Sequence, residues 1–369
     1  MSPLDPARRR QLIRFAQRLV NQERARIIVP PKESRSGFWF GGGNLVEAAD
    51  GSLLLVGRYR NAGDSRTGLA AGERGVELAI FNSRDRGRTF EKVASFAKPD
   101  LDVADSPVLS IEGSALRVAG DRVELFVSTE KDNIGYPPGF EEYQKSGTGV
   151  WTIQRLAAES VEGLRDAKVE TVLKSSDPAF LHLKDPFLYE PAGGPLMLLF
   201  CSHPYCWSSS NTGYALSRDE GRSFGDPVFD FFRRGFTWDV AMTRGTSVLD
   251  VPRVGAFRDQ QVSLLFYDGG ECVRNHAEHR QALVRPRGYS CEELGGLAYV
   301  ADGDFAHIER LSEYGPLFVS PHGTGCSRYV DVLATDDGFY AAWQQSQPDG
   351  SQPLVMNFVP RDAATEMLQ

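Results

Sequence analysis

Features that mark several classes of protein are scarce or missing in this 369-residue chain. Its five cysteines are scattered and form no CxxC pair, so we expect reduced thiols and no disulfide framework. The formal net charge is −8 and there is no basic tract, so neither nucleic acid nor an anionic membrane surface is an expected partner. No apolar run approaches the roughly 20 residues that a transmembrane helix needs.

The first residues also lack the apolar stretch of a secretory signal, because Arg8, Arg9, Arg10 and Arg14 interrupt it. We therefore expect a cytoplasmic protein. Apolar residues make up 41% of the chain, which is enough for a large core.

One eight-residue stretch occurs twice with little change. Ser83–Phe90 and Ser217–Phe224 both fit the pattern Ser-x-Asp-x-Gly-x-Thr/Ser-Phe, and each follows an apolar run. This pattern predicts a tight hairpin turn in which Asp accepts backbone N–H groups, Gly takes a positive φ and Phe packs beneath the loop. The motif resembles the Asp box of sialidases and related β-propellers, which implies a repeated all-β fold. Two unrelated Asp/Gly turns are the alternative.

The N-terminal segment has a different pattern from the rest. Asp5-Pro6 is a good N-cap and first-turn pair, and apolar residues then recur at helical spacing to about residue 25. We expect an amphipathic helix packed on the outside of the main body, with a membrane-surface helix as the alternative. After Pro30-Pro31, short alternating runs favour an all-β domain. The predicted division is a helix and linker at 1–30 and a β-domain at 31–369.

The β-domain contains five similar segments. Each has an apolar strand that begins at a polar residue, a turn, and a second strand; the segments cover 44–58, 112–130, 185–203, 244–268 and 328–344. Asp85 and Asp219 are 219 − 85 = 134 positions apart, or two units of about 67 residues. Radially arranged sheets close without long exposed edges. We predict a five-bladed β-propeller, with a six-bladed, sialidase-like propeller as the alternative.

A propeller brings the beginning of each inner strand and the end of each second strand to one face of its channel. The side chains expected there are Asn44, Arg58, Glu112, Glu130, Asp185, His203, Arg244, Asp268, Arg328 and Gln344, with Trp207, Trp238, Asp239, Glu271, Arg274, His276 and Trp343 close by. Such a set suits a carbohydrate, because aromatic rings stack on sugar C–H surfaces and charged groups bond hydroxyl or acidic substituents.

A short stretch of the third segment links the chain to known enzymes. Lys184–Phe187 resembles the Arg-Asp-Pro element of invertase-like glycosidases, and five-bladed arabinanase-like and mannoside-phosphorylase-like enzymes carry comparable elements. The resemblance implies that Asp185 stabilises the transition state or tunes the acid. Glu271-Cys272 is similar to the Glu-Cys element of these families. On the first blade, Asn44 replaces the expected Asp and cannot act as base or nucleophile.

The favoured function is a glycoside hydrolase or a related carbohydrate-active enzyme. Hydrolysis needs one protonated carboxylic acid and one ionised carboxylate. We assign Asp185 as base or charge stabiliser and Glu271 as acid, with Glu112 a candidate for either role. Asp185 could instead belong to a structural turn, Glu112 to a salt bridge, and Glu271 to a solvated loop.

The arginines at the strand ends have two explanations. An unpaired cation is costly inside a protein, so Arg244 and Arg328 either pair with Glu112 and Asp185 or bind an acidic sugar such as a uronate. Together with Arg58 they could form a carboxylate clamp.

Two further functions fit the same residues. One is a uronate-specific lyase in which His203 and His276 act as acid and base. The other is a non-catalytic carbohydrate-binding or scaffold propeller, whose inward carboxylates would all be held in ion pairs. His276, Glu278 and His279 lack the spacing of a metal site, so we assign no metal, and we expect no cofactor.

Overall fold

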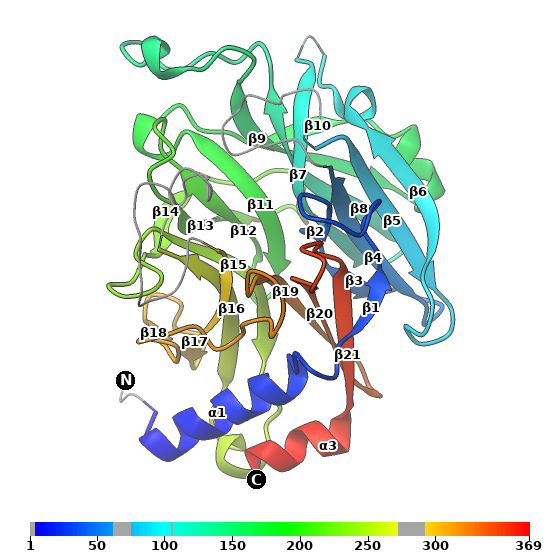
Figure 1. Ribbon diagram of the computed structural model, residues 1–369, viewed down its shortest axis with the longest axis vertical. Coiled ribbons are helices and arrows are strands. Elements are labelled where there is room, and N and C mark those ends of the chain that lie inside the picture. Colours follow the sequence, from blue (N-terminus) through cyan, green and yellow to red (C-terminus); the bar gives the residue numbers. More distant parts are fainter. Residues whose placement is uncertain (1–3, 62–74, 105, 272–291) are drawn as a thin grey trace.

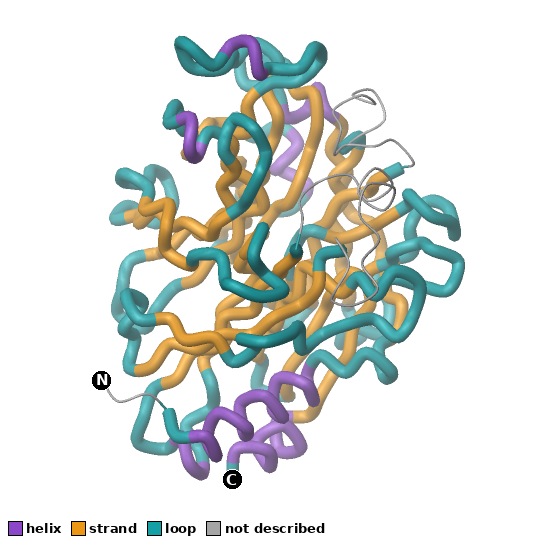
Figure 2. The backbone as a smooth tube through the Cα atoms, turned by 60° about the vertical axis from the view of Figure 1, so that its left-hand side comes forward, coloured by secondary structure: helices purple, strands orange, loops and turns teal. Residues whose placement is uncertain are grey.

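The computed structural model describes residues 4–61, 75–104, 106–271 and 292–369, and these form an all-β structure with few helices (Figure 1). Five separate sheets are arranged around a central axis (Figures 1 and 2). The predicted five-bladed β-propeller is therefore confirmed, and the six-bladed alternative is wrong. No helix in the described ranges is long and apolar enough to cross a membrane.

The first four blades each consist of strands that follow one another in the sequence. Blade 1 contains β2 (Trp39–Gly41), β3 (Leu45–Glu47), β4 (Leu53–Arg60), β5 (Glu77–Ser83) and β6 (Glu91–Ala97); blade 2 contains β7 (Val108–Ala119), β8 (Arg122–Lys131), β9 (Val150–Ala158) and β10 (Glu170–Leu173). Blade 3 contains β11 (His182–Tyr189), β12 (Leu196–His203), β13 (Asn211–Ser217) and β14 (Val228–Phe232); blade 4 contains β15 (Met242–Asp250), β16 (Val262–Gly270), β17 (Leu294–Ala301) and β18 (Ile308–Arg310). The inner strands β3, β7, β11, β15 and β19 contact one another in a closed ring.

Blade 5 joins the two ends of the chain. It contains β19 (Ser327–Ala334), β20 (Gly338–Gln345) and β21 (Leu354–Pro360), and its outer strand is β1 (Arg26–Val29). β1 is antiparallel to β21, with Arg26 opposite Met356. The segment 1–30, expected to be a helix and linker, therefore also supplies a strand of the propeller.

The N-terminal helix α1 (Pro6–Leu19) begins where the sequence predicts. The Asp5 carboxylate accepts the backbone N–H groups of Ala7 and Arg8 at 2.9 and 3.0 Å, which caps the first turn. The helix ends earlier than the expected residue 25. Asn21 explains this end, because its side chain accepts the N–H groups of the two residues Glu23 and Arg24 and forms a turn instead.

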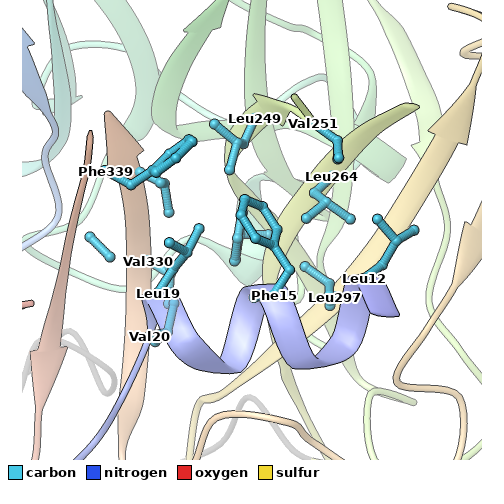
Figure 3. Packing of buried hydrophobic residues seen from close by; sticks show 14 of the residues in the cluster. Leu12, Phe15, Leu19, Val20, Leu249, Val251, Leu264, Leu297, Val330 and Phe339 are labelled. Carbon is cyan, nitrogen blue, oxygen red and sulfur yellow. The ribbon is translucent and has the colours of Figure 1, made fainter. Parts of the chain in front are cut away.

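One face of α1 packs beneath blades 4 and 5. Leu12, Phe15 and Leu19 are fully buried, and they point toward Leu264 and Phe339 among other apolar side chains of those blades (Figure 3). Burying each large apolar side chain contributes about 1.5–3 kcal/mol to stability. This face is therefore occupied by the protein itself and is not available to a membrane surface. The short helix α3 (Arg361–Thr365) contacts α1 at the same end of the molecule (Figure 1).

The two repeated hairpin turns have the same internal hydrogen bonds. Asp85 accepts the N–H of Thr89 at 2.9 Å, and Asp219 accepts that of Ser223 at 2.9 Å. The glycines of the two turns have positive φ angles of 77° and 91°, which glycine adopts at little cost. Both turns therefore have the geometry that the sequence pattern predicts.

Candidate active site

All five inner strands are irregular at the same height along the axis. The strand of blade 1 is interrupted between Gly41 and Leu45, and the register shifts within 111–114, 184–187, 245–247 and 328–331 on the other blades. Asp185 and Tyr329 lie at two of these bulges and have positive φ angles of 50° and 54°, which are uncommon for residues other than glycine. Bulges redirect side chains, and here they do so around the axis.

A small pocket lies on the axis at the level of the bulges. Its lining comes from every inner strand: Gly42, Gly43, Asn44, Gly113, Ser114, Asp185, Pro186, Phe187, Gly245, Thr246 and Tyr329. A Cβ atom on Gly113 would come within 2.4 Å of Asp185 Oδ1, so the strands can approach this closely only with glycine at that position. Residues of all five blades therefore line one axial pocket, but they lie at the bulges and not at the strand ends, and of the predicted strand-end side chains only Asn44 and Asp185 are among them.

Glu112 is held by three cations beside the pocket. Its Oε2 accepts a hydrogen bond from Arg58 Nε at 2.8 Å, and its Oε1 pairs with Arg60 and lies 3.5 Å from Lys184 Nζ. The side chains of Glu112 and Arg58 are almost completely buried. The surrounding charges favour the ionised carboxylate and hold it in one position.

Asp185 lines the pocket on the next blade. Its Oδ1 accepts hydrogen bonds from the Gly113 N–H at 3.0 Å and the Tyr329 hydroxyl at 3.4 Å, and its Oδ2 lies 3.3 Å from Arg244 Nη1. Burial acts to raise the pKa of Asp185, but the charges of Arg244 and Lys184 outweigh it and hold that pKa below its ordinary value. Asp185 is thus an ionised carboxylate at neutral pH.

Three arginines surround the ring of Tyr329. The guanidinium carbons of Arg244, Arg328 and Arg58 lie 4.0, 5.4 and 5.5 Å from the ring centroid, within the range of cation–π attraction. The Tyr329 hydroxyl accepts a hydrogen bond from Arg58 at 3.2 Å. Burial raises the pKa of Tyr329 to about 12, so the phenol is neutral. The three arginines considered as a clamp therefore do lie together.

Arg244 and Arg328 share carboxylate partners. Arg244 Nη2 lies 2.7 Å from Asp268 Oδ2 and 2.6 Å from Glu293 Oε2, and Arg328 Nη1 lies 2.5 Å from the same Glu293 oxygen. Burial raises the pKa of Asp268 to about 6, although Arg244 opposes this shift. Asp268 is fully buried, whereas the side chain of Glu293 is 19% exposed. Glu293 is therefore the more accessible of the two.

Lys184 connects the charged residues around the pocket to aromatic side chains. We use the name charged cluster for these residues: Arg58, Arg60, Glu112, Lys184, Asp185, Arg244, Asp268, Glu293, Arg328 and Tyr329. Its Nζ lies 4.5 Å from the ring centroid of Trp151 and 5.5 Å from that of Trp207, and burial lowers its pKa to about 8. His203 also lies against Trp207, and its Nδ1 is 2.9 Å from the Ser209 carbonyl oxygen. Burial and the charge of Lys184 lower the pKa of His203 to about 3, so this imidazole is neutral.

Three predicted site residues have other contacts. Asn44 lines the pocket, but its amide exchanges two hydrogen bonds with the Leu116 backbone at 2.7 and 3.0 Å and so links blades 1 and 2. Trp238 is buried inside blade 4, where its indole donates to a backbone carbonyl at 2.7 Å. Asp239 pairs with Arg310 at 2.8 Å. The loop before β15 thus places these two side chains against β16 and β18 inside blade 4.

The remaining candidates lie at the border of the described chain or away from the axis. Glu271 follows β16 directly and is partly exposed. Arg274, His276, Glu278 and His279 lie outside the described residues. Trp343 is buried and donates to Gln22 at 3.2 Å, which connects blade 5 to the segment after α1. Within the described ranges, no group of three or more His, Cys, Asp or Glu side chains could hold a metal ion.

Four residues of the cluster were not predicted as site residues. Arg60 lies two positions after Arg58 and so on the same side of β4, a spacing that the sequence does display. Lys184 and Tyr329 are neighbours of predicted residues. The bulges that turn their side chains toward the other charged residues have no clear sequence pattern. Glu293 comes just before the third strand of blade 4, and such strand starts lie at the same face as the ends of second strands.

No family model and no curated protein matches this chain. Solved structures do match. One described as a glycoside hydrolase is 12% identical, covers 96% of both chains and has a TM-score of 0.61. A β-1,2-mannobiose phosphorylase from Listeria innocua is 13% identical over 92% of this chain and 96% of its own, with a TM-score of 0.53. A Bacillus subtilis arabinanase is 12% identical over 89% and 95%, with a TM-score of 0.51. At such low identities the similarity shows a shared fold.

Proposed function

We propose that this protein is a glycoside hydrolase that acts on a sugar in the axial pocket. The observation that carries the proposal is Asp185, an ionised carboxylate that faces the pocket at a bulge with a positive φ angle. Lys184 lies over the ring of Trp207, which is partly exposed, and such rings are suited to stack on sugars. The named activities of the similar structures, a glycoside hydrolase and an arabinanase, support the same class.

The carboxylates divide between the two roles that hydrolysis requires. Asp185 is ionised and suits a base, a nucleophile or a charge stabiliser. Glu112 is held by three cations and is therefore a poor proton donor. We assign the acid role to Glu271, which follows β16 at the pocket face and is partly exposed. Asn44 does not take part in proton transfer.

The arginines favour an acidic sugar. Arg244 and Arg328 both bind one oxygen of Glu293, the most exposed carboxylate of the cluster. A uronate carboxylate could take the place of Glu293 between Arg244 and Arg328, and Arg58 lies nearby at the hydroxyl end of the Tyr329 ring. Bidentate contacts with guanidinium groups are well suited to recognise such a group.

Two smaller assignments accompany this function. We infer that the repeated hairpins are Asp boxes of the sialidase type, because both contain the same Asp-centred hydrogen bonds. We also infer a cytoplasmic location, which the free thiols of Cys201, Cys206 and Cys326 support.

A non-catalytic carbohydrate-binding protein is the second candidate. Glu112, Asp185, Asp268 and Glu293 each contact at least one cation, which is the arrangement expected for a propeller without chemistry. Ligand binding without turnover would distinguish this candidate from an enzyme.

The test compares the wild-type protein with Asp185→Asn on a panel of aryl glycosides and acidic oligosaccharides. We expect the wild type to cleave at least one glycoside and the variant to lose about 1,000-fold or more in kcat. Asparagine tolerates the positive φ, and Arg244 keeps Asp268 and Glu293 as partners, so the fold should persist in circular dichroism. Unchanged turnover in the variant would remove Asp185 from the mechanism. An unsaturated, ultraviolet-absorbing product would indicate a lyase instead.

A further inference from the structure

Two loops near Lys184 carry a group of aromatic side chains, of which the proposed chemistry uses only Trp207. One loop, residues 132–149, joins β8 to β9 and projects from the end of the molecule opposite α1 (Figures 1 and 2). The other, residues 204–210, joins β12 to β13. We use the name aromatic ridge for five of their side chains: Tyr136, Phe140, Tyr143, Tyr205 and Trp207.

The outer part of the aromatic ridge is a cluster of three rings. Phe140 and Tyr143 each lie 4.7 Å from Tyr205, measured between ring centroids. Tyr143 belongs to a short 3₁₀ helix, Glu141–Tyr143, and half of its surface (49%) is exposed. The loop therefore presents aromatic surface to solvent rather than burying it in the propeller.

The inner part of the aromatic ridge reaches the charged cluster. Tyr136 lies 5.4 Å from His182, and His182 stacks on Trp207 at 4.2 Å. Trp207 in turn lies under Lys184, the neighbour of Asp185. Tyr136 and His182 are themselves buried and support Trp207 and the loop from beneath, so the ring surface open to solvent comes from Tyr143 and from parts of Phe140, Tyr205 and Trp207.

Hydrogen bonds within the loop hold the aromatic ridge in place. Gln144 accepts the Tyr136 N–H at 3.2 Å and donates to the Thr148 carbonyl at 2.7 Å, so it ties the two sides of the loop together. The Tyr205 N–H donates to the Pro178 carbonyl at 2.9 Å, which anchors the second loop to blade 3. A binding surface with this internal support loses little freedom when it binds a ligand.

We propose that the aromatic ridge binds further sugar units of an oligosaccharide whose terminal unit occupies the axial pocket. This inference rests on the proposed function, since the occupant is the continuation of the same substrate. Rings stack on the C–H faces of sugars, and the tyrosine hydroxyls can bond sugar hydroxyls. Glu141 and Glu142 lie beside Tyr143 and would repel a chain of acidic units. The units on the aromatic ridge are therefore neutral.

The experiment measures binding and KM against chain length. The probes are linear arabino-, xylo- and β-1,2-manno-oligosaccharides of about two to six units, each with a neutral and with a uronic acid terminal unit, because the arginines at the axial pocket favour an acidic sugar. Titration calorimetry gives Kd, and aryl monoglycosides of neutral and uronic acid sugars are the shortest substrates. In the wild type we expect affinity to rise with length. Tyr143→Ala should weaken binding of the longer probes about 3- to 10-fold and leave the disaccharide unchanged. Tyr143→Phe should retain the wild-type pattern, because it keeps the ring.

Tyr314→Ala is the matched control. Tyr314 is 81% exposed on the loop before β19, outside the aromatic ridge. Tyr314→Ala should therefore show the same rise in affinity with probe length as the wild type. An equal loss for all lengths in Tyr143→Ala would mean that the ring only supports the loop, and it would overturn the proposal. If aryl glycosides are cleaved but affinity does not rise with oligosaccharide length, the proposal for the aromatic ridge is overturned and the proposed function is not. Absence of both binding and cleavage would overturn the proposed function as well.

Discussion

Asp185 and Asp331 are the same type of residue on two inner strands, and both are nearly buried, with 5% and 9% of their surface exposed. Their pKa values nevertheless move in opposite directions. Arg244, Lys184 and Arg58 hold the pKa of Asp185 below its ordinary value, although burial opposes them. Asp331 lies beyond the bulge of β19, where its carboxylate accepts the Leu45 N–H at 2.8 Å, and burial raises its pKa to about 7.

The comparison separates two influences of the fold. Propeller geometry brings an acid to the axis, but the cations at that height determine whether the acid is ionised. At the bulges, guanidinium groups stabilise the carboxylate of Asp185. Beyond them, burial raises the pKa of Asp331, and only the backbone N–H groups of Leu45 and Val332 act against that rise. Chemistry that needs an ionised carboxylate is therefore confined to the cation-rich end.

The largest effect is expected from Glu112→Gln, which removes the carboxylate shared by Arg58, Arg60 and Lys184. Leaving buried cations without their partner should lower the free energy of unfolding by about 3–5 kcal/mol, measured by urea denaturation. Glu190→Gln is the control, because Glu190 is 58% exposed and pairs with Arg117 at the surface. A loss below about 1 kcal/mol for Glu112→Gln would show that the cluster does not depend on it.

The next effect concerns Asp331 and pH. Its folded-state pKa of about 7 is above the unfolded value near 4, so the folded state binds the extra proton between these pH values. Stability from this group is complete below about pH 4 and is lost as the pH rises to about 7. Asp331→Asn should therefore match the wild type at pH 4 and exceed it by about 2–4 kcal/mol at pH 8.

Denaturant unfolding at both pH values checks this prediction, with the exposed Asp336→Asn as control. Burial also raises the pKa of Asp268, to about 6. Asp268 therefore changes the free energy of unfolding with pH to a similar extent in every variant, and this contribution cancels when the variants are compared. An Asp331→Asn curve parallel to that of the wild type would contradict the assignment.

The smallest effect is expected at the hairpin turns, where acids are ionised without any help from cations. The Thr89 backbone and side chain lower the pKa of Asp85 to about 2, and Ser223 does the same for Asp219. A lowered pKa stabilises the fold above about pH 4 and ceases to do so as the pH falls toward 2. Asp85→Ala should therefore lower the midpoint of thermal unfolding by a few degrees at pH 7 and by less at pH 3. A difference that grows on acidification would exclude this account.

The sequence was most informative where signals are local or repeated. The cap at Asp5, the two hairpin turns and the five similar segments are each readable within a few residues, and together they predicted the propeller. β1 was not predicted, because its partner β21 is 356 − 26 = 330 positions away and no local pattern specifies that pairing. The end of α1 was missed because Asn21 stops the helix within a stretch that still has helical spacing.

For the site, one topological rule located part of the charged cluster. The starts of first strands and ends of second strands gave Asp185, which lines the pocket, Arg58, Arg244 and Arg328, which are joined to Asp185 or Tyr329 by ion pairs and ring contacts, and Glu112, which pairs with Arg58. The rule omitted the starts of third strands, and so it missed Glu293. It also could not give side-chain direction, which depends on local packing. Trp238 and Asp239 precede an inner strand but pack into blade 4.

The pairing of β1 with β21 has a consequence for how the chain acquires its structure during synthesis. Strand β1 must wait for more than 300 further residues to be synthesised before its partner β21 exists. Until then the earlier blades form an open arc, with the apolar side chains of α1 uncovered. We therefore expect a nascent chain to be most exposed to aggregation until β21 has been synthesised and pairs with β1, which closes the circle.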